Sequence, residues 1–143
     1  MQIRVKKLDA RAELPSRAHA DDAGADLAVC LAEGAEFVDI WPVSTRVLQT
    51  GLALEIPYGH VGVIAARSSQ QRRGLSVHGV IDAGYRGPVG LIVTNVTHET
   101  IRVRSGDRLA QLIVHAVALP AFVDSDELSD TMRGAFGFGS TGQ

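Results

Sequence analysis

Five short segments concentrate carboxylates, arginines, hydroxyls and aromatic rings between glycines, the residue types that do chemistry or bind anions. Each segment is a weak signal of function when taken alone. The segments are DAGADL (22–27), ARSSQQ (66–71), GVIDAGYRG (79–87), RSGDRLAQLI (104–113) and RGAFGFGSTG (133–142).

The third segment places one carboxylate, Asp82, after an apolar pair and surrounds it with three glycines, a tyrosine and an arginine. Taken by itself it favours a β-hairpin, because Gly and Asp supply the positive-φ positions of tight turns. Val80 and Ile81 would then close a short strand. In that interpretation Asp82 is a turn residue, Tyr85 packs on a neighbouring strand and Arg86 is a solvated charge.

The second segment predicts an anion site. Ser68 and Ser69 can cap a short helix before QQRR, and a serine at a helix start offers its hydroxyl and free backbone N–H groups to an anion. Simple capping beside an exposed Arg67 is the alternative, above all for Ser69. Gln111 lies inside an otherwise apolar segment, where a buried amide needs partners. A ligand contact and a core or subunit-interface glutamine both remain open for it.

The last segment belongs to a stretch, 124–143, without helical or strand periodicity, and its glycines predict flexibility. A frayed terminus is the common fate of chain ends. However, a lid that closes over a ligand would use aromatic, cationic and hydroxyl groups together. This stretch contains all three, in Arg133, Phe136, Phe138, Ser140 and Thr141.

Strands must position these segments. TIRVR (100–104) alternates apolar and polar residues, and the segments 60–66, 89–96 and 108–117 are more continuously apolar, which predicts strands buried on both faces. Gly and Pro interrupt the apolar segments at short intervals. We therefore expect an all-β barrel or jelly roll, with one short helix starting near Ser68. The core domain should span 1–123, followed by a flexible arm over 124–143.

Composition excludes several classes of protein. The 143 residues, 45% hydrophobic and 21% charged, suit one domain that buries roughly 70% of its unfolded surface. A net charge of -2 argues against a nucleic-acid binder. Cys30 has no partner for a disulfide, the histidines are scattered, and no apolar run approaches the about 20 residues of a membrane helix. The N-terminus also lacks the apolar core of a signal peptide. We expect a cytoplasmic protein without nucleic-acid or membrane partners.

In their order and spacing the five segments resemble the five motifs of the trimeric dUTPases, the deoxyuridine triphosphate nucleotidohydrolases. The resemblance covers most of the chain, and a series of five motifs ending in GFGSTG is highly specific. It implies a dUTPase-like jelly roll with a flexible C-terminal arm. It also implies Mg²⁺-dependent hydrolysis of dUTP to dUMP and pyrophosphate, which keeps uracil out of DNA.

The resemblance implies a role for each matching residue. Asp82 takes the place of the general base, which deprotonates a water that attacks the α-phosphorus of dUTP. Tyr85 matches the tyrosine that packs under the deoxyribose and leaves no room for a 2′-hydroxyl. Residues of the other motifs would bind the triphosphate and the metal. The phosphates would be bound by Arg67, Ser68, Ser69 and Gln111. Asp26 would hold the waters of the Mg²⁺ ion.

The arm has implied roles as well. Arg133, Ser140 and Thr141 would bind the γ-phosphate end, and Phe138 would stack on the uracil. In the family this arm crosses to a neighbouring subunit and the active sites lie between subunits, so the resemblance implies a homotrimer.

The chain departs from the family pattern in its second motif. Ala66 replaces the usual proline and Ser69 the usual glycine. Ser69 with QQRRGL looks closer to the dCTP deaminases, which share the fold. Those enzymes need a catalytic glutamate near GLIVTN (90–95), and this stretch has no acid. Cytosine deamination is therefore rejected.

A second departure concerns the base. The family builds a β-hairpin between the positions of Gly74 and Asp82, and here LSVHGVI (75–81) is shorter. A pyrophosphatase with altered base specificity is therefore an alternative to a strict dUTPase, because hydrogen-bonded base recognition depends on correctly placed donors. His78 lies in this segment, and it is either a polar contact to the base or an exposed turn residue. A non-catalytic nucleotide-binding module is the remaining alternative. A third departure from the family pattern is Phe136, which precedes GFG in the arm.

Overall fold

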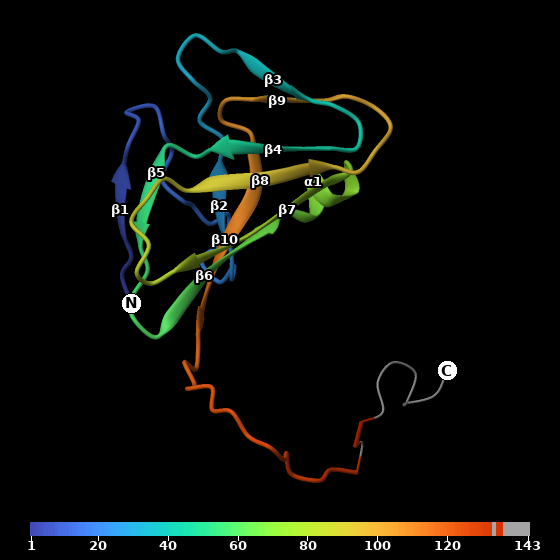
Figure 1. Cartoon of the computed structure of the whole chain (residues 1–143). Helices are drawn as coiled ribbons and strands as arrows, with labels where there is room; N and C mark the ends of the chain where they lie inside the picture. The colour runs from blue at the N-terminus through green and yellow to red at the C-terminus, as the bar shows by residue number, and fades with distance from the viewer. Residues whose placement is uncertain (133, 136–143) are drawn as a thin grey trace.

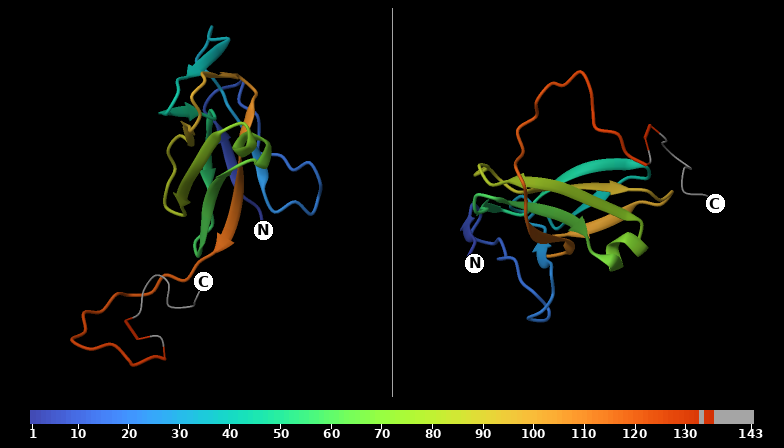
Figure 2. Two further views of the ribbon diagram at one scale, coloured as in Figure 1. Left: turned by 90° about the vertical axis from the view of Figure 1, so that its right-hand side faces the viewer. Right: turned by 90° about the horizontal axis from the view of Figure 1, so that it is seen from below.

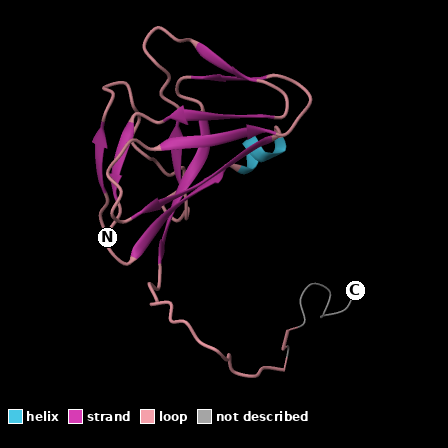
Figure 3. Ribbon diagram, viewed as in Figure 1, coloured by secondary structure: helices cyan, strands magenta, loops and turns pink. Residues whose placement is uncertain are grey.

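A computed structural model describes residues 1–132, 134 and 135. Within them the chain forms ten strands and one short helix (Figures 1 and 3), so the predicted all-β fold is confirmed. The strands are β1 (Arg4–Lys7), β2 (Ala25–Ala28), β3 (Phe37–Ile40), β4 (Ser44–Gln49), β5 (Leu52–Glu55), β6 (His60–Ala66), β7 (Leu75–Asp82), β8 (Gly90–Asn95), β9 (Ile101–Arg104) and β10 (Arg108–Ala116), and the helix is α1 (Ser68–Arg72).

A six-stranded antiparallel sheet forms the centre of the fold, in the order β2-β10-β6-β7-β8-β4. Two antiparallel ribbons, β1–β5 and β3–β9, flank this curled sheet at the left and at the top of Figure 1. Strands distant in sequence are therefore neighbours, and β10 lies between β2 and β6. This arrangement brings the first, second and fourth sequence segments to one place.

The core lies on one face of the central sheet. In β9 the expected alternation is present, with Ile101 and Val103 buried and both arginines exposed. β6 buries Gly62, Ile64 and Ala66 between partly exposed residues. The prediction that such strands are buried on both faces is wrong for a single chain. The outer face carries Val47, Val80 and Ile92, whose exposed fractions are 59%, 69% and 41%.

β7 contradicts the expected hairpin over 75–81. The strand runs from Leu75 to Asp82 without a turn, paired with β8 over 75–78 and with β6 over 78–82. It stays extended because Leu75, Val77 and Ile81 continue the inward alternation into the core. His78 is consequently an exposed strand residue and not a turn histidine.

The stretch 79–87 does connect antiparallel neighbours, as the hairpin interpretation predicts, because β7 and β8 are paired and 83–89 joins them. Its glycines do not supply positive φ angles, however, since none of Gly79, Gly84 and Gly87 adopts one. Gly87 has a different role. The Tyr85 ring packs over it so closely that a Cβ would overlap the ring.

The helix α1 begins at Ser68, as predicted. Its N-cap is Arg67, whose side chain makes no capping hydrogen bond. The predicted capping by the Ser68 and Ser69 hydroxyls is wrong, because both serines lie inside the helix and not before it. No helix among the described residues is long and apolar enough to span a membrane.

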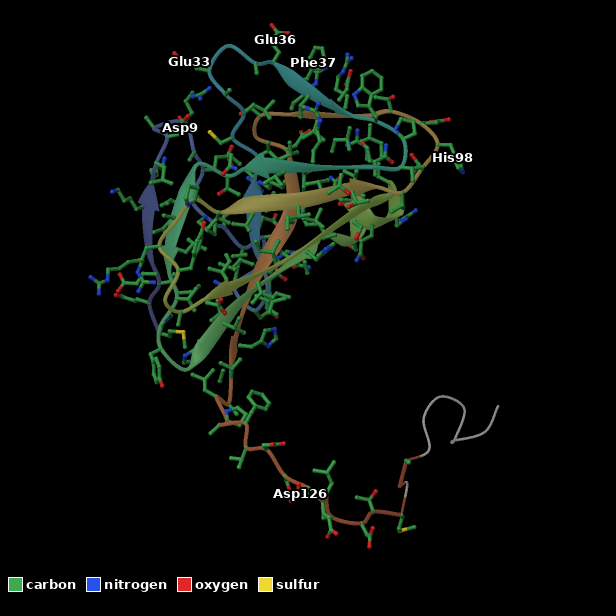
Figure 4. The ribbon with its side chains drawn as sticks, viewed as in Figure 1. Asp9, Glu33, Glu36, Phe37, His98 and Asp126 are labelled. Carbon is green, nitrogen blue, oxygen red and sulfur yellow. The ribbon has the colours of Figure 1, made fainter. Side chains whose placement is uncertain are left out.

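After β10 the chain leaves the body of the protein in both views of Figure 2. The stretch 117–132 contains no helix or strand, and its side chains, Asp126 among them, stand away from the sheet in Figure 4. Several apolar side chains are therefore exposed, among them Leu119 at 66%, Phe122 at 96% and Val123 at 84%.

Candidate functional site

A pocket of about 330 Å³ lies where β2, β10 and the start of α1 meet. Four of the residues singled out in the sequence line it: Asp26, Arg67, Ser68 and Gln111. They come from three segments that are distant in the chain. Sheet order explains their meeting, because β10 pairs with β2 on one side and with β6, which leads into α1, on the other.

Asp26 and Arg67 are the charged pair that lines this pocket, and Arg108 lies next to it without lining it. The Arg67 Nε lies 3.0 Å from Asp26 Oδ1, and the Arg108 Nη1 lies 3.9 Å from Asp26 Oδ2. The Arg67 Nη1 also donates to the carbonyl of Arg108 at 3.5 Å. The Asp26 side chain is only 13% exposed, so the carboxylate holds both guanidinium groups at the pocket. Two such cations suit a polyanionic ligand.

Gln111 is half-buried and lies directly opposite Asp26 in the register of β10 and β2. Its side chain packs on Gly24, where a Cβ would lie 2.8 Å from the Gln111 Cδ and 3.0 Å from its Cβ. A glycine at position 24 is therefore what lets the amide lie along the pocket.

The serines contribute unequally. Both serines are exposed, but only Ser68 is among the residues that line the pocket. The N–H groups of both serines make no backbone hydrogen bond within the described part of the chain, as is usual in a first helical turn. The N–H of Ser68 is therefore available to an anion in the pocket.

Sequence reasoning missed Arg108. It starts β10, three residues before Gln111, and lies 3.8 Å from Glu13 as well as close to Asp26. The signal was its place in RSGDRLAQLI, at the start of the apolar segment that contains Gln111. Gln70 was also missed, and its Oε1 is buried without a hydrogen-bond partner among the described residues.

Asp82 and Tyr85 lie elsewhere. Asp82 pairs with Val61 at the start of β6, whereas Arg67 follows the end of that strand, and the step from Val61 to Arg67 spans about 20 Å along the backbone. Asp82 is exposed, and its side chain makes no hydrogen bond or ion pair in the part of the chain that the structure describes. One chain therefore does not bring Asp82 into the pocket.

Four of the predicted binding residues, Arg133, Phe138, Ser140 and Thr141, lie outside the described residues. The interpretation of the arm therefore stays a prediction.

Asp26 is the residue to test for a metal. Residues 1–132 with 134 and 135 hold no group of three or more acidic, histidine or cysteine side chains that could hold an ion. Mg²⁺ does not need such a cage, because it keeps several waters and takes phosphate oxygens as ligands. One carboxylate beside an anion pocket fits this way of binding.

Comparisons with known proteins identify relatives of this chain. The sequence profile described as dUTPase matches residues 10–142. A deoxyuridine 5′-triphosphate nucleotidohydrolase of Thermobifida fusca is 42% identical over 147 residues, with 99% of this chain and 79% of the relative covered. The chain belongs to the dUTPase family.

Solved structures show the same likeness. The dUTPase of Staphylococcus bacteriophage 80alpha with dUPNHPP has a TM-score of 0.87 and 31% identity, over 99% of both chains. A mutant dUTPase from phage phi11 of S. aureus, whose structure reveals the coordination of a structural Mg(II) ion, has a TM-score of 0.79. It is 28% identical, over 89% of this chain and 98% of its own.

Proposed function

We propose that this protein hydrolyses dUTP to dUMP and pyrophosphate. The observation that carries the proposal is the pocket lined by Arg67, Ser68, Asp26 and Gln111, with Arg108 beside Asp26, in a chain that belongs to the dUTPase family. The phosphates bind there, with the arginines compensating their charge and Gln111 donating from its amide. Ser69 contributes its backbone N–H.

Asp82 is the proposed general base. It orients a water and removes its proton while the oxygen attacks the α-phosphorus, and pyrophosphate leaves. A well-placed base contributes about 10²–10⁴ in rate, or about 3–5 kcal/mol of the barrier. Tyr85 lies against the sugar and excludes the 2′-hydroxyl. Mg²⁺, when bound, neutralises charge on the phosphate oxygens, and Asp26 holds it through water.

The active unit is proposed to be a homotrimer with sites between subunits. A distance of about 20 Å along β6 separates Asp82 from the pocket of its own chain. In the proposed trimer, one copy therefore supplies the pocket and a second copy supplies Asp82. The outer sheet face, with Val47, Val80 and Ile92 exposed, offers apolar surface for such contacts. In this proposal 1–123 form the core and 124–143 the arm, whose Arg133, Phe138, Ser140 and Thr141 close a neighbouring site.

A second candidate is a pyrophosphatase of the same mechanism with broader base choice. The uninterrupted β7 supports it, because residues 75–81 form no turn that could enclose a base. The exposed His78 of this strand is then a candidate polar contact to a bound base.

The test is pyrophosphate release with Mg²⁺ from dUTP, dCTP, dTTP and UTP, with Asp82→Asn as the control. Turnover confined to dUTP and lost in the variant supports the dUTPase. Comparable turnover of dCTP or dTTP supports the second candidate. Absence of turnover with every nucleotide contradicts both and leaves a nucleotide-binding module.

A further inference from the structure

The turn after β7 carries Asp82 at its start and Tyr85 at its centre, and internal contacts fix part of its shape. The N–H of Tyr85 donates to the carbonyl of Asp82 at 3.0 Å. The Tyr85 hydroxyl donates to the carbonyl of Pro88 at 2.9 Å. These bonds orient the ring, but residues 83–89 belong to no strand. At the end of the stretch, Val89 is held to the body of the protein, because its N–H donates to the carbonyl of Leu52 at 2.8 Å and its carbonyl accepts from the N–H of Thr50 at 3.1 Å. The part of the turn that carries Tyr85 needs a further connection.

Arg86 makes this connection. Its Nη1 donates to the carbonyl oxygens of Ala83 at 2.6 Å and Tyr85 at 2.8 Å. Its Nη2 lies 3.7 Å from Oε1 of Glu55 at the end of β5, and Glu55 in turn lies 3.0 Å from the Nε of Arg4 on β1. One guanidinium thus joins two carbonyls of the turn to the β1–β5 ribbon.

We propose that Arg86 is a positioning residue that holds the turn so that Asp82 and Tyr85 keep their working geometry, with Glu55 as its anchor. The inference rests on the proposed function, in which Asp82 activates water and Tyr85 excludes ribose. The turn and Glu55 use the donors of Arg86. Arg86 therefore acts through Asp82 and Tyr85 and not on the substrate. The planar fork of donors is specific to arginine, and a lysine cannot reproduce it.

The experiment compares Arg86→Ala and Arg86→Lys with Arg46→Ala in the full chain. Arg46 is an exposed arginine of β4 whose side chain makes no hydrogen bond or ion pair with other described residues. The measurements are kcat and KM for dUTP, the preference for dUTP over UTP, and hydrogen–deuterium exchange of the amides in 83–89. Thermal melting of each variant reports global stability.

Arg86→Ala should lower kcat by about 10- to 100-fold, as small displacements of catalytic groups do, while KM changes little. The preference for dUTP should fall and exchange should rise in 83–89, with partial recovery in Arg86→Lys and no change in Arg46→Ala. A kcat and a sugar preference within about twofold of the parent protein would overturn the proposal, because a twofold change corresponds to well under 1 kcal/mol of activation free energy.

If the parent protein does not hydrolyse dUTP, the proposed function fails. Exchange in 83–89 then still tests the connection made by Arg86. Unchanged exchange in Arg86→Ala would overturn it, and faster exchange confined to this turn would support the structural part of the inference.

Discussion

Gly24 lies under the side chain of Gln111, and replacing it with alanine tests how tightly the pocket is built. A Cβ at this position would overlap the Gln111 Oε1 and lie 2.8 Å from its Cδ and 3.0 Å from its Cβ. The amide can swing away, but the Gln111 Cβ is fixed by the β10 backbone. Gly24 does not adopt a positive φ, so lack of space, and not backbone strain, opposes the substitution.

Overpacking of this kind costs about 1–3 kcal/mol. For a chain of this length that lowers Tm by about 3–10 °C. The Gln111 amide is also displaced from the pocket, so KM for dUTP should rise. In a Gln111→Ala background the Cδ and Oε1 contacts are absent and only the Cβ contact at 3.0 Å remains. There Gly24→Ala should cost less than half as much.

The assay is thermal unfolding of the parent protein, both single variants and the double variant. Gly84→Ala is the matched control, because a Cβ at Gly84 would meet nothing within 4 Å and Gly84 does not adopt a positive φ. Its Tm should change by no more than corresponds to about 0.5 kcal/mol. Equal costs of Gly24→Ala in both backgrounds, or an unchanged Tm of the single variant, would refute the packing argument.

Two further predictions concern stability. The buried Asn95 donates from Nδ2 to the carbonyls of Ile40 at 3.0 Å and Glu99 at 2.7 Å, so Asn95→Asp should cost about 3–5 kcal/mol by removing both donors. Urea unfolding followed by circular dichroism measures this, and an unchanged midpoint would contradict it. The hydrogen bond from the Arg11 side chain lowers the pKa of Asp9 from 3.8 to about 2, so this pair stabilises the fold above about pH 4 and the stabilisation is lost as the pH falls through 2. The Tm difference between the parent protein and Asp9→Asn should shrink over this range, and a constant difference from pH 5 to pH 2 would argue against the pair.

Much of the fold follows from local sequence. The alternation in 100–104 and the apolar segment 60–66 predict β9 and β6, the latter with its observed bounds His60–Ala66. The helix starts at Ser68, as SSQQR suggests. These elements were predictable because their side-chain period and their flanking glycines are local properties.

Pairing was not predictable from local sequence. Continuous apolar runs suggested strands covered on both faces, but one chain covers only the inner face of β6 and β8. The β7 strand was missed because glycines at 79, 84 and 87 resemble turn residues, whereas in the fold Gly79 packs on Ile64 and Gly87 under Tyr85. Close approach, and not a positive φ, explains Gly87, whereas a Cβ at Gly79 would make only ordinary contact with Ile64.

The site was predicted in part. Asp26, Arg67, Ser68 and Gln111 do meet in one pocket. The ion pair between Asp26 and Arg67 and the approach of Arg108 depend on which strands are neighbours, and so does the separation of Asp82 from them. No local pattern contains that information.

Whether Asp82 and Arg67 act together across a subunit boundary is tested most directly by complementation. Asp82→Asn and Arg67→Ala chains are mixed in equal amounts, unfolded, refolded together and assayed for pyrophosphate release from dUTP. If each site takes the two residues from different chains of a trimer, about a quarter of the sites contain both intact residues. The mixture should then recover about a quarter of the parent activity. Recovery no greater than in a mixture of Asp82→Asn with Asp82→Ala chains would contradict a site shared between subunits.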